Sequence, residues 1–345
     1  MMKKFRTIVL GSVVMLSGCG PASDWIKDAP VHDIDFNADV RWADVPQDSI
    51  SRPEMLVSFG PYILWADNSL DRPVWIWNED TGELSSPVMS GRASNEILDV
   101  QEIMQTPDGF ALVDTFKKRL YYYRLDSASA EWRQENSEDT KEFCWVTVAE
   151  DTIVGQLMDG TARYGVKPAG ETIKRFGDYS EYGLSNGSGW GLLMGHGTAN
   201  ASRGLYAVYS CYTSAYSIVD YRDTATVCSR SLELSSFNNH GDHYVSMRPD
   251  SKMGFVSVSS NDNYIFALYD GKKLDYYMSN PGIGLRGNDI CIFSWDGSYV
   301  RRLHSDRPVS CIAWNEDRQS LYLCVLDNDE FRFAELAADT IQSMF

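Results

Sequence analysis

The chain has 345 residues, of which 48 are acidic and 31 basic, so its formal net charge is −17. An excess of acidic side chains repels phosphate backbones, and we therefore expect no nucleic-acid partner. Hydrophobic residues make up 43% of the chain and aromatic residues 12%. These fractions suffice for a packed core and exclude a disordered chain.

The start of the chain has the pattern of a secretory signal. A basic segment at residues 3–6 precedes an apolar run at residues 7–16, which is too short to span a bilayer as a helix of about 20 residues. The sequence Leu-Ser-Gly-Cys then ends at Cys19 and resembles the bacterial lipobox. The resemblance implies cleavage before Cys19 and a lipid on that residue. The alternative is an ordinary signal with an incidental cysteine.

This pattern predicts the organisation of the whole chain. We expect a signal peptide at residues 1–18, a lipidated tether at residues 19–32 and a single domain at residues 33–345. Gly20 follows Cys19 where an aspartate would signal retention in the inner membrane, and by resemblance this favours the outer membrane. The protein would face the periplasm or the cell surface, with its acyl chains supplying the attachment.

Residues 33–336 consist of short runs rich in Val, Ile, Tyr, Phe and Trp, with almost no helical periodicity. Four Asp-Gly pairs are typical of tight hairpin turns. Candidate innermost strands begin near Glu54, Asp99, Phe143, Gly204, Gly254 and Val309. A repeat of about 40–50 residues with four short strands is the signature of a β-propeller blade. We predict an all-β fold with six blades, and seven blades are the alternative.

The last two repeats carry further information. Residues 271–288, rich in Gly and Pro, are expected to be a loop insertion between two strands of the fifth blade. The sixth repeat has only three strands, and we expect residues 33–42 to supply the fourth by pairing with residues 331–336. An N-terminal strand would thus close the last blade and leave no exposed sheet edge there.

Six cysteines follow Cys19, and no two of them have the close spacing of a metal or redox site. Most lie in apolar, strand-like runs, where a free thiol behaves as a small hydrophobic side chain. Cys311 and Cys324 flank one hairpin turn and form the best candidate disulfide if any exists. We expect no metal ion and no cofactor.

Residues 91–98, Gly-Arg-Ala-Ser-Asn-Glu-Ile-Leu, resemble the Gly-Arg-Gly-Pro-x-Glu-Phe-Leu motif of TolB-like six-bladed propeller lipoproteins. Ala93 and Ser94 replace the Gly-Pro of that motif. The segments at residues 110–126 and 290–324 fit the same family pattern. The resemblance implies an envelope lipoprotein of a Gram-negative bacterium, and it carries over no catalytic signature.

Arg92 and Glu96 lie in the segment that best matches the family. In the structural interpretation, Glu96 accepts hydrogen bonds from loop amides and Arg92 meets a carboxylate of a neighbouring blade. In the functional interpretation, Arg92 faces the channel mouth and binds an anionic ligand. Both interpretations make this loop a candidate binding or structural site.

Three other candidate sites have weaker patterns. Trp190, in a glycine-rich stretch, is the best exposed platform for a sugar ring. His240 and His243 could supply two imidazoles, although their spacing is not that of a helical zinc motif, and an exposed loop explains them equally well. Ser185 matches G-x-S-x-G, which requires a strand before the serine and a helix after it. We expect an inter-blade loop there, and likewise around His196.

With no catalytic signature, the sequence favours a non-enzymatic binding or scaffold module, whose ligand is an unknown protein or glycan. The alternative is a glycan-binding or glycan-degrading propeller, acting as a lectin, lyase or hydrolase. The central pocket discriminates between them: tryptophan with converging Asp, Glu or His favours the glycan, whereas apolar filling favours the scaffold.

Overall fold

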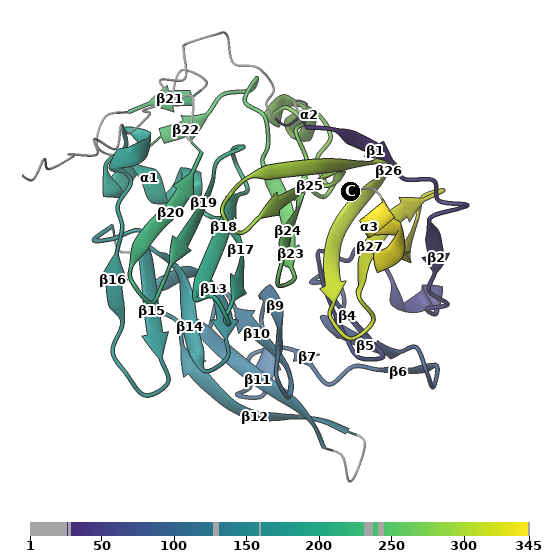
Figure 1. Ribbon diagram of the computed structural model, residues 1–345. Coiled ribbons are helices and arrows are strands. Elements are labelled where there is room, and N and C mark those ends of the chain that lie inside the picture. Colours follow the sequence, from purple (N-terminus) through teal and green to yellow (C-terminus); the bar gives the residue numbers. More distant parts are fainter. Residues whose placement is uncertain are drawn as a thin grey trace, which may run out of the picture.

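The computed structural model describes residue 26 and residues 29–126, 131–158, 160–230, 237–240 and 245–343. Cys19 and His243 lie outside this part of the chain. Strands dominate the described residues, and the sheets form a propeller-like ring around a common centre (Figure 1). The predicted all-β propeller is confirmed.

Four sheets each contain four antiparallel strands that follow one another in the chain. These strands are β3 (Met55–Phe59), β4 (Tyr62–Ala66), β5 (Val74–Asn78) and β6 (Glu83–Ser85); β9 (Val100–Thr106), β10 (Gly109–Asp114), β11 (Arg119–Asp126) and β12 (Glu131–Asp139); β13 (Phe143–Ala149), β14 (Thr152–Leu157), β15 (Tyr164–Pro168) and β16 (Lys174–Phe176); and β17 (Gly195–Asn200), β18 (Leu205–Ser210), β19 (Tyr216–Asp220) and β20 (Ala225–Ser229).

An eight-stranded sheet holds the remaining two units, which share one long strand. Its strands are β1 (Val31–Asp33), β2 (Val40–Trp42), β23 (Phe255–Ser260), β24 (Tyr264–Tyr269), β25 (Gly287–Ser294), β26 (Tyr299–Asn315), β27 (Ser320–Asp327) and β28 (Glu330–Ala337). The first part of β26 pairs with β25 and its second part with β27. We thus count six four-stranded units in the described residues. Their innermost strands β3, β9, β13, β17, β23 and β26 contact one another in a closed cycle.

The short elements lie outside these four-stranded units. They are the strand pairs β7 (Met89–Ser90) with β8 (Glu96–Ile97) and β21 (Phe237–Asn239) with β22 (Val245–Met247), the 3-10 turns η2 (Gln47–Ser49) and η3 (Ser180–Tyr182), and the helices α1 (Asn186–Leu193), α2 (Leu274–Ser279) and α3 (Ala338–Ser343). Helix α2 lies in the insertion expected at residues 271–288. None of the helices in the described residues is long and apolar enough to cross a membrane.

The N-terminal strand closes the last unit as predicted. Strand β2 pairs antiparallel with β28, with Val40 opposite Leu336 and Trp42 opposite Ala334. Just before it, β1 runs parallel to the first part of β26. The side chains of Ile34 and Phe36, between these two strands, are buried in the core of the eight-stranded sheet. The start of the domain is therefore an integral part of its last two units.

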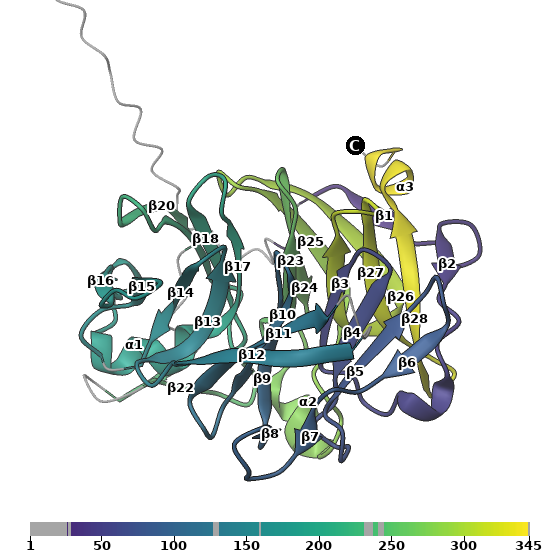
Figure 2. The same cartoon turned by 90° about the horizontal axis from the view of Figure 1, so that it is seen from below.

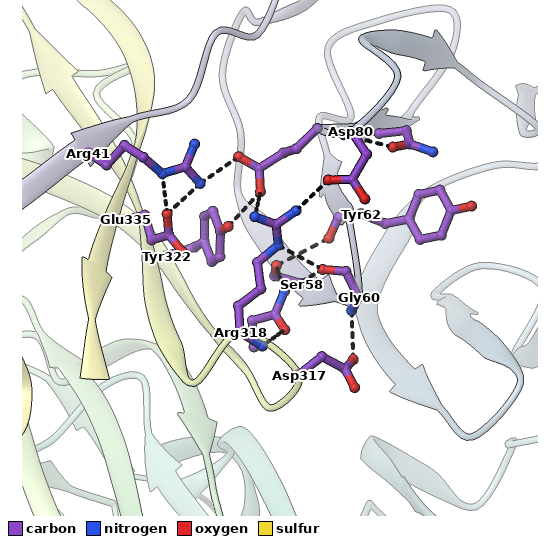
Figure 3. Close-up of polar contacts among 12 residues, drawn as sticks. Arg41, Ser58, Gly60, Tyr62, Asp80, Asp317, Arg318, Tyr322 and Glu335 are labelled. Carbon is purple, nitrogen blue, oxygen red and sulfur yellow. Dashed lines mark hydrogen bonds and ion pairs between the residues drawn. The ribbon is translucent and has the colours of Figure 1, made fainter. Parts of the chain in front are cut away.

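A polar network joins the first and last units beside this closure (Figure 3). Glu79, whose side chain is 7% exposed, accepts hydrogen bonds from Tyr322 Oη at 2.6 Å and from Arg41 at 3.0 Å. Arg41 also pairs with Glu335 on β28, and Arg318 pairs with Glu79. These residues come from four separate segments, so the network fixes the ring at its seam.

The fourth unit corrects one sequence prediction, because its innermost strand is β17 and not the segment beginning at Gly204. Gly204 forms the β17–β18 turn with a φ of +72°. The chain of β17 is glycine-rich because neighbouring groups leave no room for side chains. A Cβ at Gly195 would lie 1.9 Å from the carbonyl oxygen of Tyr209, and one at Gly197 would lie 2.5 Å from the ring of Tyr206. Close packing thus requires glycines in this central strand, and a glycine-rich sequence is typical of a loop.

The G-x-S-x-G segment also differs from the expectation. A helix, α1, follows Ser185 where the sequence predicted a loop. The segment before it is the 3-10 turn η3, and the strand that a nucleophile elbow requires is not there. The helix forms although it contains glycines, because Leu192 and Leu193 are buried against neighbouring elements. Ser185 is therefore not presented on a strained strand-to-helix turn.

All six cysteines in the described part of the chain are free thiols, and five of them are buried. Cys311 and Cys324 lie directly opposite each other on β26 and β27 but do not form a disulfide. Burial raises the pKa of the Cys311 thiol well above its ordinary value. These residues act as small core side chains in the structure.

Candidate functional site

The ring has two ends that differ in their connections. The innermost strands begin at one end, which we call the mouth end, and run toward the other. The mouth end carries α1, α2 and the β7–β8 pair, whereas α3 lies at the opposite end (Figure 2). Longer connections at the mouth end make it the more elaborate face of the propeller. Loops carried by a rigid scaffold are the usual place for binding residues.

A cavity of about 430 Å³ opens at the mouth end, where the innermost strands start. Its volume falls within the range of small-molecule sites. It shares Glu54, Met55, His196 and Val256 with a second space of about 360 Å³ that continues along the innermost strands. The polar side chains that line the mouth cavity are Arg52, Glu54, Asn68, Asp99, Gln101, Thr115, His196, Arg286 and Ser310. The centre of the ring is therefore open, and its mouth is lined by both polar and apolar side chains.

Three side chains from different units meet where the two spaces join. Glu102, on β9, accepts a hydrogen bond from Trp145 Nε1 at 2.9 Å, and the same Oε2 atom lies 3.3 Å from His196 Nδ1. The rings of Trp145 and His196 meet edge to face, with their centroids 5.6 Å apart. This places an acid, an imidazole and an indole together at the channel mouth.

The contacts of His196 in this cluster favour the protonated form of its imidazole. Burial alone would lower the pKa of its imidazole, but Cys211 and the Glu102 carboxylate, both hydrogen-bonded to the ring, raise that pKa well above its ordinary value. The side chains of His196 and Glu102 are each 16% exposed, so water screens the pair only partly. Cys211 is buried and does not line the mouth cavity, so it offers no nucleophile there.

We expect Glu102→Gln to bring the pKa of His196 down and to cost about 1.5–3 kcal/mol of stability at pH 7. The folded-state pKa of His196 is raised, so the pair contributes fully below the unfolded pKa of about 6.5 and its contribution fades as the pH rises through the folded value. NMR titration of the His196 ring and denaturant unfolding at several pH values measure both effects. An unchanged His196 titration in the variant would contradict this account.

Arg52 and Asn68 form a second polar group at the rim of the mouth. Arg52 pairs with Glu54 at 3.0 Å through Nη2. Asn68 fastens the first two units together, because its side chain donates to the Val100 carbonyl at 2.9 Å and accepts from the Val100 amide at 2.8 Å. The mouth is thus a preorganised arrangement of side chains contributed by several units.

The loop with Arg92 and Glu96 lies at the mouth end but does not line the cavity. Glu96 accepts a hydrogen bond from the Ala93 amide at 2.8 Å, and the Lys117 ammonium donates to the Ala93 and Glu96 carbonyls. Arg92 is exposed and forms no ion pair with any residue that the structure describes. The carboxylate partner expected for Arg92 is therefore not found in this part of the chain.

The remaining candidates lie apart from the cavity. Trp190 on α1 is 37% exposed and does not line the cavity. His240 is exposed and its Nε2 atom lies 3.2 Å from the Ser246 hydroxyl across the β21–β22 hairpin. We find no cluster of three metal-ligating side chains within the described ranges. Sequence reasoning missed Glu102, and it counted Trp145 only as one of several tryptophans in strand-like runs that could stack on a sugar, because both residues occupy ordinary strand positions.

Exposed apolar side chains gather around the mouth. Nine large apolar residues are exposed in the described part of the chain, and seven belong to elements and loops of the mouth end: Met89, Leu98, Phe116, Trp190, Tyr276, Met278 and Ile283. The mouth end therefore combines a cavity of mixed polar and apolar lining with these exposed apolar residues, which we call the apolar rim.

The fold defines a β-propeller with a cavity at one end of its central channel. A family model described as TolB-like 6-blade propeller-like matches residues 84–317. This match spans more than half of the chain, and the chain belongs to that family. No curated protein matches the sequence.

Several solved structures are similar to this chain at low identity. Chaetomium thermophilum Raptor is 10% identical with a TM-score of 0.47, and the match covers 84% of this chain but 28% of Raptor. The Cps50 (Swd1) beta-propeller domain of Myceliophteria thermophila is 10% identical with a TM-score of 0.47, covering 86% of this chain and 99% of that one. U3-55K is 8% identical with a TM-score of 0.48, and the match covers 83% of this chain and 81% of U3-55K.

Proposed function

We propose that the protein is an outer-membrane lipoprotein whose propeller binds a ligand at the channel mouth without catalysing its conversion. The observation that carries the binding role is the cavity of about 430 Å³ at the mouth end, lined by side chains from several units. The lipid attachment rests on the sequence around Cys19. The acidic chain has little attraction for anionic lipid, so the acyl chains would supply the anchor.

Mass spectrometry of the mature N-terminus tests the anchoring. We expect a lipid-modified Cys19 as the first residue, and we expect Cys19→Ala to leave the membrane fraction. Cys228→Ala, which alters a half-buried thiol of the propeller, is the matched control and should fractionate like the unaltered protein. A mature N-terminus at an unmodified residue after Cys19, or one that still carries Met1, would refute the anchoring.

A glycan is the ligand class that the mouth favours over a purely apolar partner. Trp145 lies beside Glu102 and His196, which is the combination of an aromatic ring with polar groups that sugar recognition uses. Glu102 is already hydrogen-bonded to Trp145 and His196, so in this cluster it acts as a positioning group for the indole and the imidazole. The apolar rim offers a second contact surface for a protein partner.

The cavity can be blocked through a glycine that has space beside it. Gly284 lines the mouth, and a Cβ there would meet only Arg52 Cδ, at 3.8 Å. We expect Gly284→Trp to fill the cavity and abolish retention of envelope oligosaccharides on the immobilised full-length protein. Gly191→Trp, where a Cβ would meet nothing within 4 Å, is the control at the same end and should retain them. Equal retention by both variants would place binding elsewhere.

A further inference from the structure

Two arginines at the mouth have hydrogen-bond donors that no described group uses. The Arg286 guanidinium lies over the Phe331 ring, 5.0 Å from its centroid, and forms no ion pair with any residue in the described ranges. Arg52 pairs with Glu54 through Nη2, but its Nε atom is buried without a partner there. An unsatisfied buried donor is costly, which suggests that a ligand or solvent completes it.

The two arginines face the same space. Both line the mouth cavity, and the loop that carries Arg286 passes against Arg52, because a Cβ at Gly284 would lie 3.8 Å from Arg52 Cδ. The planar donor array of an arginine matches the two oxygens of a carboxylate. The cation–π contact with Phe331 holds the Arg286 guanidinium at the mouth before any ligand arrives. This part of the mouth is therefore suited to a carboxylate.

Other side chains of the same cavity call for hydrogen-bond donors on the ligand. The Asp99 carboxylate lines the cavity, and no described group binds it. An ionised carboxylate only accepts hydrogen bonds, so it suits hydroxyl groups. Thr115 Oγ1 is buried and has no partner among the described residues. Gln101 donates to the Cys144 carbonyl at 2.7 Å, which leaves its own amide oxygen as a further acceptor.

We propose that the mouth binds a carbohydrate that bears a carboxylate, such as an oligosaccharide containing a uronic acid; this inference rests on the proposed function. Arg286 and Arg52 bind the carboxylate, Asp99 and Thr115 bind hydroxyl groups, and Trp145 contacts the sugar ring. A simple inorganic anion would meet the arginines but would offer no hydroxyl donors to Asp99. A neutral sugar can accept hydrogen bonds from the arginines through its hydroxyl oxygens, but it offers no negative charge to pair with them.

Calorimetry on the detergent-solubilised full-length protein tests this. The probes are a glucuronic acid disaccharide, its glucose counterpart of the same linkage, and free glutamate. We expect the acidic disaccharide to bind at least tenfold more tightly than the neutral one. Arg286→Ala should reduce this difference, replacing both Arg52 and Arg286 by Ala should make the two affinities equal, and Asp99→Asn should weaken both. Arg72→Ala is the control, since it removes an exposed arginine that does not line the cavity, and it should leave the affinities for both disaccharides unchanged.

Equal affinity of the unaltered protein for the two disaccharides would overturn the inference. A preference for the acidic disaccharide that survives the removal of both Arg52 and Arg286 would overturn it too. Tighter binding of glutamate than of either sugar would overturn the carbohydrate inference and would show that the ligand is an amino acid or a peptide terminus. If the neutral sugar binds equally well and Gly284→Trp abolishes its binding, the proposed function stands without this inference. If neither sugar binds and Gly284→Trp changes no ligand retention, both proposals fail.

Discussion

A chain that lacks residues 1–42 should lose at least about 3–6 kcal/mol of stability relative to a chain that begins at residue 29. The shorter chain lacks β1 and β2, and with them Ile34 and Phe36, which are each 5% exposed in the folded protein. Burying a large apolar side chain contributes about 1.5–3 kcal/mol, so these two residues alone account for the estimate. Denaturant unfolding of the two chains measures the difference.

Two further losses act in the same direction. Removing β2 leaves β28 as an edge strand with unpaired backbone groups. It also removes Arg41, which pairs with Glu79 and Glu335 at the ring seam, and Trp42, which stacks on Phe36 with ring centroids 5.7 Å apart. We therefore expect the loss to exceed the apolar contribution alone.

The point variant Arg41→Ala separates the stability contributed by the ion pairs of the ring seam from that contributed by strand β2. It removes the ion pairs but keeps β2, and Arg41 is half exposed, so we expect it to cost about 1 kcal/mol or less. If the truncated chain unfolds at nearly the same denaturant concentration as its longer control, the closure observed between β2 and β28 would contribute nothing to stability.

The propeller could be predicted because its evidence is local and repeated. Asp-Gly turns and short runs of β-branched and aromatic residues recur at a blade-sized spacing, so each hairpin supports the others. The closing strand could be predicted by counting, since the sixth repeat was one strand short. The Gly60 amide donates to the Asp317 carboxylate at 2.7 Å, and this contact joins the first and last units beside the closure.

The channel mouth could not be predicted, because its signal is spatial. Glu102, Trp145 and His196 are far apart in the sequence and meet only because innermost strands of different units line one channel. His196 was further hidden by the glycines of β17, which a sequence pattern assigns to a loop. Helix α1 formed for the related reason that tertiary burial outweighs the low helix propensity of glycine.

Arg163 is a second feature that no sequence pattern revealed. It is 1% exposed, and its guanidinium carbon lies 4.7 Å from the ring centroid of Tyr182, 4.8 Å from that of Tyr164 and 5.4 Å from that of Tyr179. Burial alone would lower its pKa, but the three tyrosines raise it, so the side chain stays charged throughout the accessible pH range. A cation enclosed by aromatic rings here replaces an apolar core residue.

We expect Arg163→Ala to cost about 3–5 kcal/mol, because it removes three cation–π contacts and leaves a cavity among the rings. Arg163→Met is the matched control, since it keeps most of the volume while losing the charge and the guanidinium hydrogen bonding, and it should cost less. Both losses should be independent of pH between about 5 and 8, because the arginine does not titrate there. Denaturant unfolding measures each variant. A cost below about 1 kcal/mol for Arg163→Ala would show that the tyrosine rings repack without their cation.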